Sequence, residues 1–282
     1  MEIQNWSKLN HRYPFVLTLN ISKPNHPSCT LHPLSTNYSY KALVKASDTQ
    51  FYISFTQDSC PSKGEKTLKR RVLFTKGWSL QKGGWAIGEN IQLPGWLKGA
   101  FIHEDKTFFL TSYFYATDET TGAIEKETPY GRLFLSRKEG DKAVLTDWLP
   151  LKKGGLGELV LTEGHLWLQG HERVKDEPDS EYALALRHFD LRSQKFSLKS
   201  RRNMKSDTVW LKLIGAKGHR LFFSAFGGYL VTSVKEERAE GTHYVPFSRA
   251  ATSIFLHEDQ VWVAGGLYGT RVLTPSNANV ER

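Results

Sequence analysis

FIHEDKTFFL, residues 101–110, has the pattern of a β-hairpin: a short apolar strand, a tight polar turn and a second strand rich in aromatic residues. A near copy of this segment, FLHEDQVWVA, occupies residues 255–264. Three further segments share the pattern: LVKASDTQFYIS (43–54), VLTEGHLWLQ (160–169) and LIGAKGHRLFFS (213–224). The chain therefore contains an internal repeat that is built from hairpins.

The five hairpins align on one turn residue, and the residue three positions later is apolar in every copy. The turn residues and their apolar partners are Asp48 and Phe51, Asp105 and Phe108, Gly164 and Trp167, Gly218 and Leu221, and Asp259 and Trp262. The turn residues are separated by about 57, 59, 54 and 41 residues. Such spacing fits β-propeller blades of about 40–50 residues, with insertions in the early copies.

Each hairpin is followed by further strand candidates, which makes a unit of four strands. These candidates are 69–74 and 85–93, 131–137 and 143–149, 182–189 and 195–199, 228–234 and 243–247, and 270–274 alone in the last unit. The last unit lacks a fourth strand, and Tyr13–Ile21 is a strand without a partner. We expect Tyr13–Ile21 to complete the last unit, because this pairing would remove an exposed sheet edge.

The repeat predicts one all-β domain over residues 1–282: a five-bladed β-propeller of four-stranded blades, with the N-terminal strand closing the last blade. A β-sandwich or jelly roll is the alternative, because strand counts alone do not fix topology. Deletion of residues 1–22 is expected to destabilise the protein. Three long loops, 56–67, 116–129 and 171–181, lie between the second and third strands of their units. In a propeller, these loops and the connections between blades share one face, which favours a binding surface there.

The chain has a formal net charge of +9, which favours an acidic partner: an acidic protein, nucleic acid or an acidic membrane. Only Cys29 and Cys60 are present and they form no CxxC pair, so a reducing compartment is expected. The N-terminal residues lack a signal-peptide apolar run, and the sequence contains no 18-residue apolar stretch. These features predict a cytoplasmic protein without a membrane span.

The sequence contains no GxGxxG, P-loop, HExxH, GxSxG or paired CxxC motif, so no catalytic, cofactor or metal residue is predicted. His103 and His257 occupy turns of different units, and such turns point away from each other. A glycosidase needs two facing carboxylates. The predicted innermost strands offer only Glu158, with Asp207 ahead of another strand. A carbohydrate-active propeller, a hydrolase or a lectin, remains one alternative function.

Nucleic-acid binding is a second alternative, because basic runs occur at KTLKRR (66–71) and KSRRNMK (199–205). Most aromatic residues, however, lie at inward strand positions, where core packing explains them. Trp78, Trp85 and Trp96 are placed less regularly, and we interpret them as packing residues between blades.

The phrases HEDKTFFL (103–110) and HEDQVWV (257–263) resemble propeller hairpins of the general WD-repeat or kelch kind. The resemblance implies the propeller architecture and nothing beyond it. The GH…WD phrase and the kelch double glycine are absent in register, so the resemblance reaches no specific family.

We therefore expect a non-catalytic macromolecule-binding propeller, such as an inhibitor or immunity-type protein, that recognises a protein partner with an acidic surface. A cation follows each of the first four units. The predicted partner-binding residues are Lys98, Lys152, Lys153, Arg201, Arg202 and Arg249. If they lie in the connections between blades, they form a positive ring around the channel mouth.

Overall fold

A computed structural model confirms that the chain is an all-β protein: the described residues form strands β1 to β21 and no helix. Two strands, β1 (Phe15–Asn20) and β2 (Ser28–Pro33), pair only with each other. The structure describes residues 15–20, 28–34, 39–47, 49–58, 71–81, 84–113, 131–151, 157–173, 182–204, 211–217, 220–225, 228–235, 238–246, 253–257, 260–264 and 270–273.

The remaining strands form consecutive units, each beginning with an antiparallel hairpin. Unit 1 contains β3 (Ser39–Ser47), β4 (Gln50–Asp58), β5 (Arg71–Gln81) and β6 (Gly84–Leu93). Unit 2 contains β7 (Trp96–His103), β8 (Lys106–Tyr113), β9 (Arg132–Glu139) and β10 (Lys142–Pro150). Unit 3 contains β11 (Leu159–Thr162), β12 (His165–Arg173), β13 (Tyr182–Asp190) and β14 (Ser197–Met204). Unit 4 contains β15 (Lys212–Lys217), β16 (Arg220–Ala225), β17 (Gly228–Lys235) and β18 (Arg238–Pro246). Unit 5 contains β19 (Ser253–His257), β20 (Gln260–Ala264) and β21 (Thr270–Leu273).

All five predicted hairpins are present as paired strands. The turn between β7 and β8 has positive φ at Glu104 (49°) and Asp105 (59°), and the turn between β11 and β12 has positive φ at Glu163 (49°) and Gly164 (81°). Two consecutive residues with positive φ make a type I′ turn, whose twist matches that of the strands it joins. A polar residue or glycine at these positions therefore fixes the register of each hairpin.

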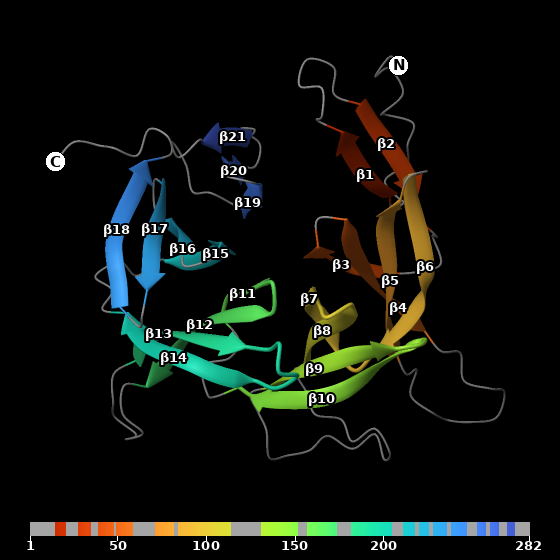
Figure 1. Cartoon of the computed structure of the whole chain (residues 1–282), viewed down its shortest axis with the longest axis horizontal. Helices are drawn as coiled ribbons and strands as arrows, with labels where there is room; N and C mark the ends of the chain where they lie inside the picture. The colour runs from red at the N-terminus through yellow and green to blue at the C-terminus, as the bar shows by residue number, and fades with distance from the viewer. Residues whose placement is uncertain are drawn as a thin grey trace.

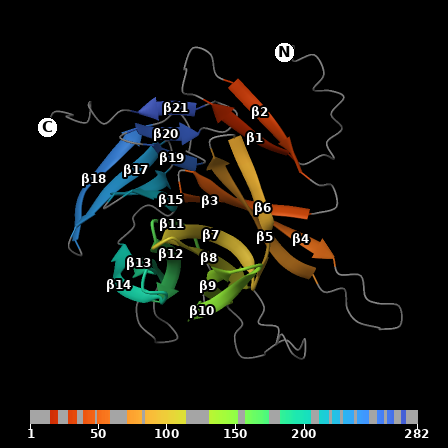
Figure 2. The ribbon, with the colours of Figure 1, turned by 45° about the vertical axis from the view of Figure 1, so that its right-hand side comes forward.

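The units follow one another around a common centre in the order of the chain (Figure 1). The first strands β3, β7, β11, β15 and β19 lie nearest the centre in Figure 1, and β6, β10, β14 and β18 lie further out. In the turned view of Figure 2, β10, β14 and β18 again lie on the outside. Neighbouring first strands contact one another in sequence, β3 with β7, β7 with β11, β11 with β15, and β15 with β19. One end of every described unit therefore points to the same centre.

The described buried residues form three hydrophobic clusters, each of which joins two consecutive units. Tyr52 of unit 1 packs with Phe109 of unit 2, and Leu110 of unit 2 belongs to one cluster with Leu166 of unit 3. The third cluster joins Trp167 of unit 3 to residues of unit 4. Units 1 to 4 therefore bury apolar side chains against their neighbours in the described part of the chain.

The predicted role of the N-terminal strand is wrong within the described residues. β1 pairs with β2 along its whole length, and β21 pairs with β20 alone. The hairpin β1–β2 lies beside unit 1, where the His32 ring contacts the Trp78 ring edge-on at 5.2 Å. A partner a few residues away requires far less loop-closure entropy than a partner at the other end of the chain, and residues 28–33 supply that partner.

Units 1 and 2 also share backbone pairing, which the sequence does not indicate. β10 meets β6 in parallel at Lys142 and Gln92, and the Gln92 amide donates a 2.8 Å hydrogen bond to the Asp141 carbonyl. This single bridge joins the two units into one eight-stranded sheet.

Candidate functional site

The structure places the predicted cations differently from the expected ring of connections. Lys98 lies inside β7, and Arg201 lies inside β14, where its side chain is exposed. The sequence places both residues after the predicted end of a unit, but β7 and β14 include these positions. Arg202 lies in β14 as well, whereas Lys152, Lys153 and Arg249 fall outside the described residues.

Lys98 occupies a β-bulge that recurs in unit 1. The register of β7 shifts between Leu97 and Gly99, and that of β3 shifts between Tyr40 and Ala42. The residue skipped by pairing is Lys98 in one strand and Lys41 in the other, and each lies seven residues before its aligned turn residue. A bulge changes the direction of the extra side chain, so two neighbouring inner strands present a lysine in the same way. Lys41 is exposed and Lys98 is partly buried.

Inner strands of units 2, 3 and 4 run in the same direction. Gly99 of β7 is opposite Leu161 of β11, and further along the strand Phe101 lies beside Gly164. The next contact is an ion pair of 3.1 Å between Lys212 Nζ at the start of β15 and Glu158 Oε1 just before β11. The starts of these strands therefore lie at the same end of the molecule.

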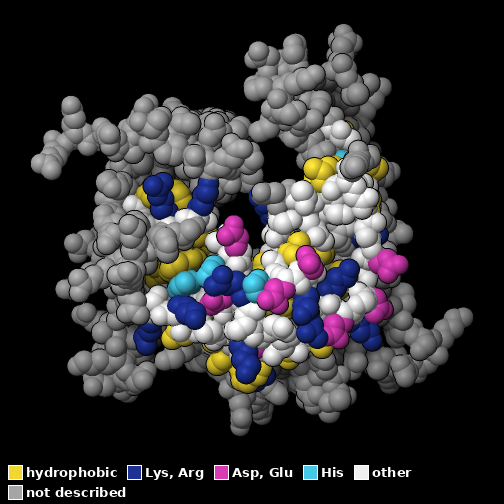
Figure 3. All heavy atoms as spheres, viewed as in Figure 1, with side chains coloured by type: hydrophobic (Ala, Val, Ile, Leu, Met, Phe, Trp, Pro, Cys, Tyr) yellow, Lys and Arg dark blue, Asp and Glu magenta, His cyan; other side chains and the backbone are white. Residues whose placement is uncertain are grey.

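Basic side chains are found near this end of three inner strands. We call Lys41, Lys98 and Lys212 the inner-strand lysines; Glu158, the carboxylate singled out from the sequence, neutralises only the last of them. Figure 3 shows the central opening in a space-filling view, with Lys and Arg side chains at its border. Asp207, the other carboxylate singled out from the sequence, falls outside the described residues.

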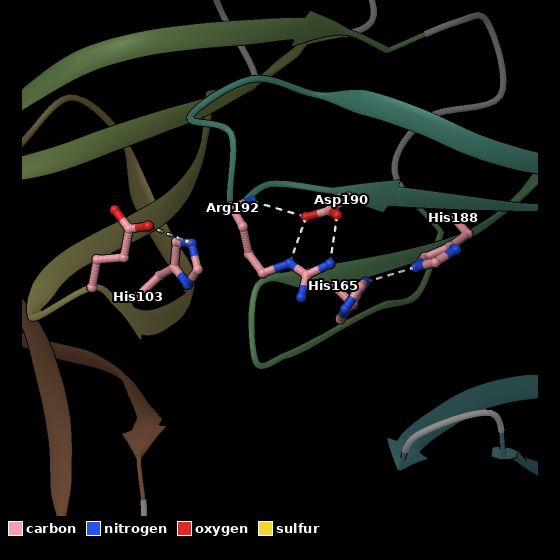
Figure 4. A network of polar contacts seen from close by, with 6 residues as sticks. His103, His165, His188, Asp190 and Arg192 are labelled. Carbon is pink, nitrogen blue, oxygen red and sulfur yellow. Dashed lines mark hydrogen bonds and ion pairs between the residues drawn. The ribbon is translucent and has the colours of Figure 1, made fainter.

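A second polar cluster lies on β12 and β13 of unit 3, and the sequence did not indicate it. His165 Nδ1 lies 3.1 Å from His188 Nε2, and the His188 ring stacks on Trp167 with centroids 4.0 Å apart and planes 7° apart (Figure 4). Trp167 and His188 are direct partners in the strand register, and His165 is opposite Asp190. The two histidines are therefore diagonal neighbours across a strand pair.

Burial lowers the pKa of both histidines, and the neighbouring charges act in both directions. Desolvation lowers the pKa of His188 to about 4, and the facing His165, Lys199 and Arg192 act in the same direction. Desolvation also lowers the pKa of His165, with Arg192 contributing. A neutral imidazole has one N–H and one lone pair, so one of the two facing nitrogens donates and the other accepts.

Asp190 and Arg192 form a bidentate pair at the end of β13. Arg192 donates from Nε to Asp190 Oδ1 at 2.9 Å and from Nη2 to Oδ2 at 2.7 Å, and its backbone amide also donates to Oδ1. The hydrogen bonds from Arg192 hold the pKa of Asp190 well below its usual range, and the same bonds raise the pKa of Arg192. Both carboxylate oxygens are therefore committed to Arg192.

The turn histidines do not join this cluster. His103 Nε2 lies 3.9 Å from Glu104 Oε1, and Figure 4 shows this pair standing apart from His165 and His188. His257 ends β19, and His171 lies in β12. Among the residues that the structure describes, no group of three or more His, Cys, Asp or Glu side chains converges on a metal position.

The tryptophans Trp78 and Trp85 pack in the protein. Trp78 is 1% exposed and stacks on Phe51, and Trp85 meets Phe51 edge-on at 4.9 Å. Trp96 is partly buried at the start of β7. Trp78 and Trp85 therefore share the contact with Phe51, and Trp78 also contacts His32.

Within the described part of the chain, no helix has the length and apolarity needed to cross a membrane.

Comparisons with known proteins do not show a family for this chain. No protein-family model and no curated protein matches it. Among solved structures it is similar to a mutant of Synechocystis apocarotenoid oxygenase, with a TM-score of 0.40 and 11% identity over 82% of this chain and 55% of that one. It is also similar to the computationally designed Ika8 protein, with a TM-score of 0.35 and 8% identity over 84% and 96% of the two chains. The chain thus spans about half the length of the oxygenase, and likeness at these TM-scores carries no argument about function.

Proposed function

We propose that this chain is a non-catalytic binding protein, a five-bladed β-propeller that receives an acidic segment of a protein partner at its inner-strand lysines. An inhibitor or immunity-type role is the form of binding that we favour. The five consecutive units, the cores between neighbours and the contacts between successive first strands support the propeller. A crystal structure would test it, because a β-sandwich would instead show two stacked sheets.

The repeated lysine bulge is the observation that carries the proposed function. Lys41 and Lys98 occupy the same bulged position on adjacent inner strands, and Lys212 lies at the same end of β15. Three ammonium groups on strands that converge on one centre produce a positive potential there, which attracts carboxylates and increases the rate of encounter.

A protein partner fits this site better than nucleic acid does. Binding to single-stranded nucleic acid uses aromatic rings as stacking surfaces beside the basic groove. In the hairpin that carries Lys98, Phe101, Phe108 and Phe109 are at most 1% exposed, so their rings are not available for stacking, and Trp96 is partly buried. Carboxylate groups of an acidic peptide need only the ammonium charges.

A defined acidic probe tests the proposal. The wild-type chain should bind a fluorescent oligoglutamate peptide in an anisotropy titration, with affinity that falls as salt is added. The double variant Lys41→Glu and Lys98→Glu should bind on the order of tenfold more weakly. The matched control reverses Lys106 and Lys138, which are exposed at the turn ends of β8 and β9, and should bind as the wild type does.

Equal loss in both double variants would show a general charge effect and would overturn the assignment of the site. Tighter salt-dependent binding of a DNA oligonucleotide than of oligoglutamate would instead favour the nucleic-acid alternative. Binding of neutral oligosaccharides that is insensitive to both variants would favour the carbohydrate alternative.

A further inference from the structure

Glu158 lies among the inner-strand lysines, although it has the opposite charge. It comes just before β11, which contacts β7 on one side and β15 on the other. From unit 1 to unit 4, the charged residues near the strand starts are therefore, in order, Lys41, Lys98, Glu158 and Lys212. One carboxylate thus interrupts a row of cations that could otherwise bind any polyanion.

The buried residue Gln169 holds both partners of the ion pair between Glu158 and Lys212. Its backbone amide donates a 2.8 Å hydrogen bond to the Glu158 carbonyl. Its side chain binds the residues on either side of Lys212, because Nε2 donates to the Leu211 carbonyl and Oε1 accepts from the Leu213 amide. Gln169 is 4% exposed. The two backbone segments are therefore fixed relative to each other, and only two side chains remain to be ordered when the ion pair forms.

We infer that Glu158 determines specificity: it occupies Lys212 and repels continuous polyanions, so the site selects an acidic segment with a neutral or basic residue opposite Glu158. This inference rests on the proposed function and adds the charge pattern of the partner. Carboxylates of the partner can bind Lys41 and Lys98 directly, but at Lys212 a carboxylate must displace Glu158. Repulsion of wrong ligands is a general way to obtain specificity.

The exposure of the ion pair allows this competition. The side chain of Glu158 is 42% exposed and that of Lys212 is 57% exposed, so a ligand can reach both. An exposed ion pair is weak, so an incoming carboxylate can displace it. A lysine or arginine of the partner would instead bind Glu158 itself. A uniform run of glutamates or phosphates offers no such cation, and its charge beside Glu158 lowers affinity.

Two peptides of equal length test the selection in anisotropy titrations: hexaglutamate, and the same peptide with lysine at its two central positions. Glu158→Gln should bind hexaglutamate about threefold more tightly than the wild type does, as expected for the loss of an exposed ion pair. Its affinity for the lysine-containing peptide should stay the same or fall, because the carboxylate that faces the lysines is lost. The matched control is Glu139→Gln, which removes a carboxylate from the exposed ion pair with Arg137 in β9 and should alter neither affinity.

A second variant tests whether the gain depends on Lys212. Glu158→Gln combined with Lys212→Met has the net charge of the wild type, and it should bind hexaglutamate no more tightly than the wild type does. If this double variant keeps the gain of Glu158→Gln, the inference is wrong. Circular dichroism of each variant checks that it is folded.

Three further results would overturn the inference: an unchanged affinity of Glu158→Gln for hexaglutamate, an equal gain in Glu139→Gln, or an equal gain for both peptides. The proposed function is judged separately. If the wild type binds hexaglutamate and the double variant Lys41→Glu and Lys98→Glu binds it more weakly, the proposed function stands whatever Glu158→Gln does. If neither the wild type nor Glu158→Gln binds either peptide, both the proposed function and this inference are wrong.

Discussion

Trp167 combines burial in the core between units 3 and 4 with stacking on the His188 ring. Replacement of Trp167 by Ala should lower the free energy of unfolding by about 3–5 kcal/mol, because it removes a large buried side chain and leaves a cavity. Urea titration measures this loss. The matched control is Trp148→Ala, because Trp148 is 46% exposed on β10 and should lose much less. Equal losses at the two positions would contradict the core assignment.

The neutral histidine pair predicts a dependence of stability on pH. The pKa of His188 is lowered to about 4 in the folded protein, against about 6.5 when unfolded, so the unfolded chain binds more protons between these values. The free energy of unfolding should therefore fall as pH decreases from 6.5 towards 4, and His188→Gln should have a shallower slope. Urea titrations at pH 7, 5.5 and 4.5 measure it. If the wild type and His188→Gln had the same slope, His188 would have the same pKa in the folded and unfolded states.

Individual core positions could be predicted from the repeat, but the polar clusters could not. Phe108, Trp167 and Leu221 share one aligned position and are all buried, whereas Phe51 at the same position is partly buried. The pairing of His165 with His188 depends on the register between β12 and β13, which residues 174–181 separate in the sequence. Period-2 patterning identifies the strands but leaves that register open.

At the scale of elements, unit 3 has a glycine at the aligned position that is Lys41 in unit 1 and Lys98 in unit 2, and its contacts explain the difference. Gly157 is seven residues before its turn residue, as Lys41 and Lys98 are, and a Cβ there would overlap the backbone oxygen of Gln169. Gln169 is buried and joins units 3 and 4, because its Nε2 donates to the Leu211 carbonyl and its Oε1 accepts from the Leu213 amide.

Gly157→Ala should therefore lower the free energy of unfolding by about 1–3 kcal/mol, as overpacking does. Thermal unfolding followed by circular dichroism measures the change. Gly88→Ala is the control, because its Cβ would approach only the Gly77 carbonyl at 3.4 Å. A Gly157→Ala protein that melts with the wild type would contradict this close approach.

Most strands could be predicted from hairpin patterning, and the misses have physical causes. β5 continues to Gln81, beyond the predicted end at Phe74, because Gly77 is accommodated inside the strand beside the Tyr52 ring. β2 escaped prediction because SCTLHP is short and ends in proline. Glycine and proline usually interrupt strands. Where a strand nevertheless contains one of them, tertiary neighbours that the sequence does not reveal make this possible.

At the scale of the whole molecule, the N-terminal hairpin β1–β2 is expected to stabilise unit 1. Deletion of residues 1–34 removes the His32 contact with Trp78 and should lower the free energy of unfolding by about 2 kcal/mol or more, as the buried tryptophan face becomes exposed. Urea titration and quenching of tryptophan fluorescence by acrylamide measure the two effects. Deletion of residues 1–14 alone is the control, because it leaves both strands intact. If deletion of residues 1–34 changes neither measurement, the hairpin does not support unit 1.

The order of the units could be predicted, because each unit begins with its hairpin. The strand that pairs with the N-terminal strand β1 could not be predicted. Counting strands assigns Tyr13–Ile21 to the last unit. This count does not include β2, which is the strand that pairs with β1. Strand counts reveal an unpaired edge, whereas the identity of the segment that covers the edge depends on competition between local and distant partners.

The bridge between Lys142 and Gln92 has a consequence for local opening of the native state. Units 1 and 2 belong to one sheet because a single backbone bridge joins β6 to β10, whereas units 3 and 4 form separate sheets that meet their described neighbours through side chains. Amide protons in units 1 and 2 should therefore exchange with solvent as one foldon, while units 3 and 4 open separately. The cooperativity of opening is therefore expected to be strongest between units 1 and 2, where backbone pairing adds to side-chain contacts.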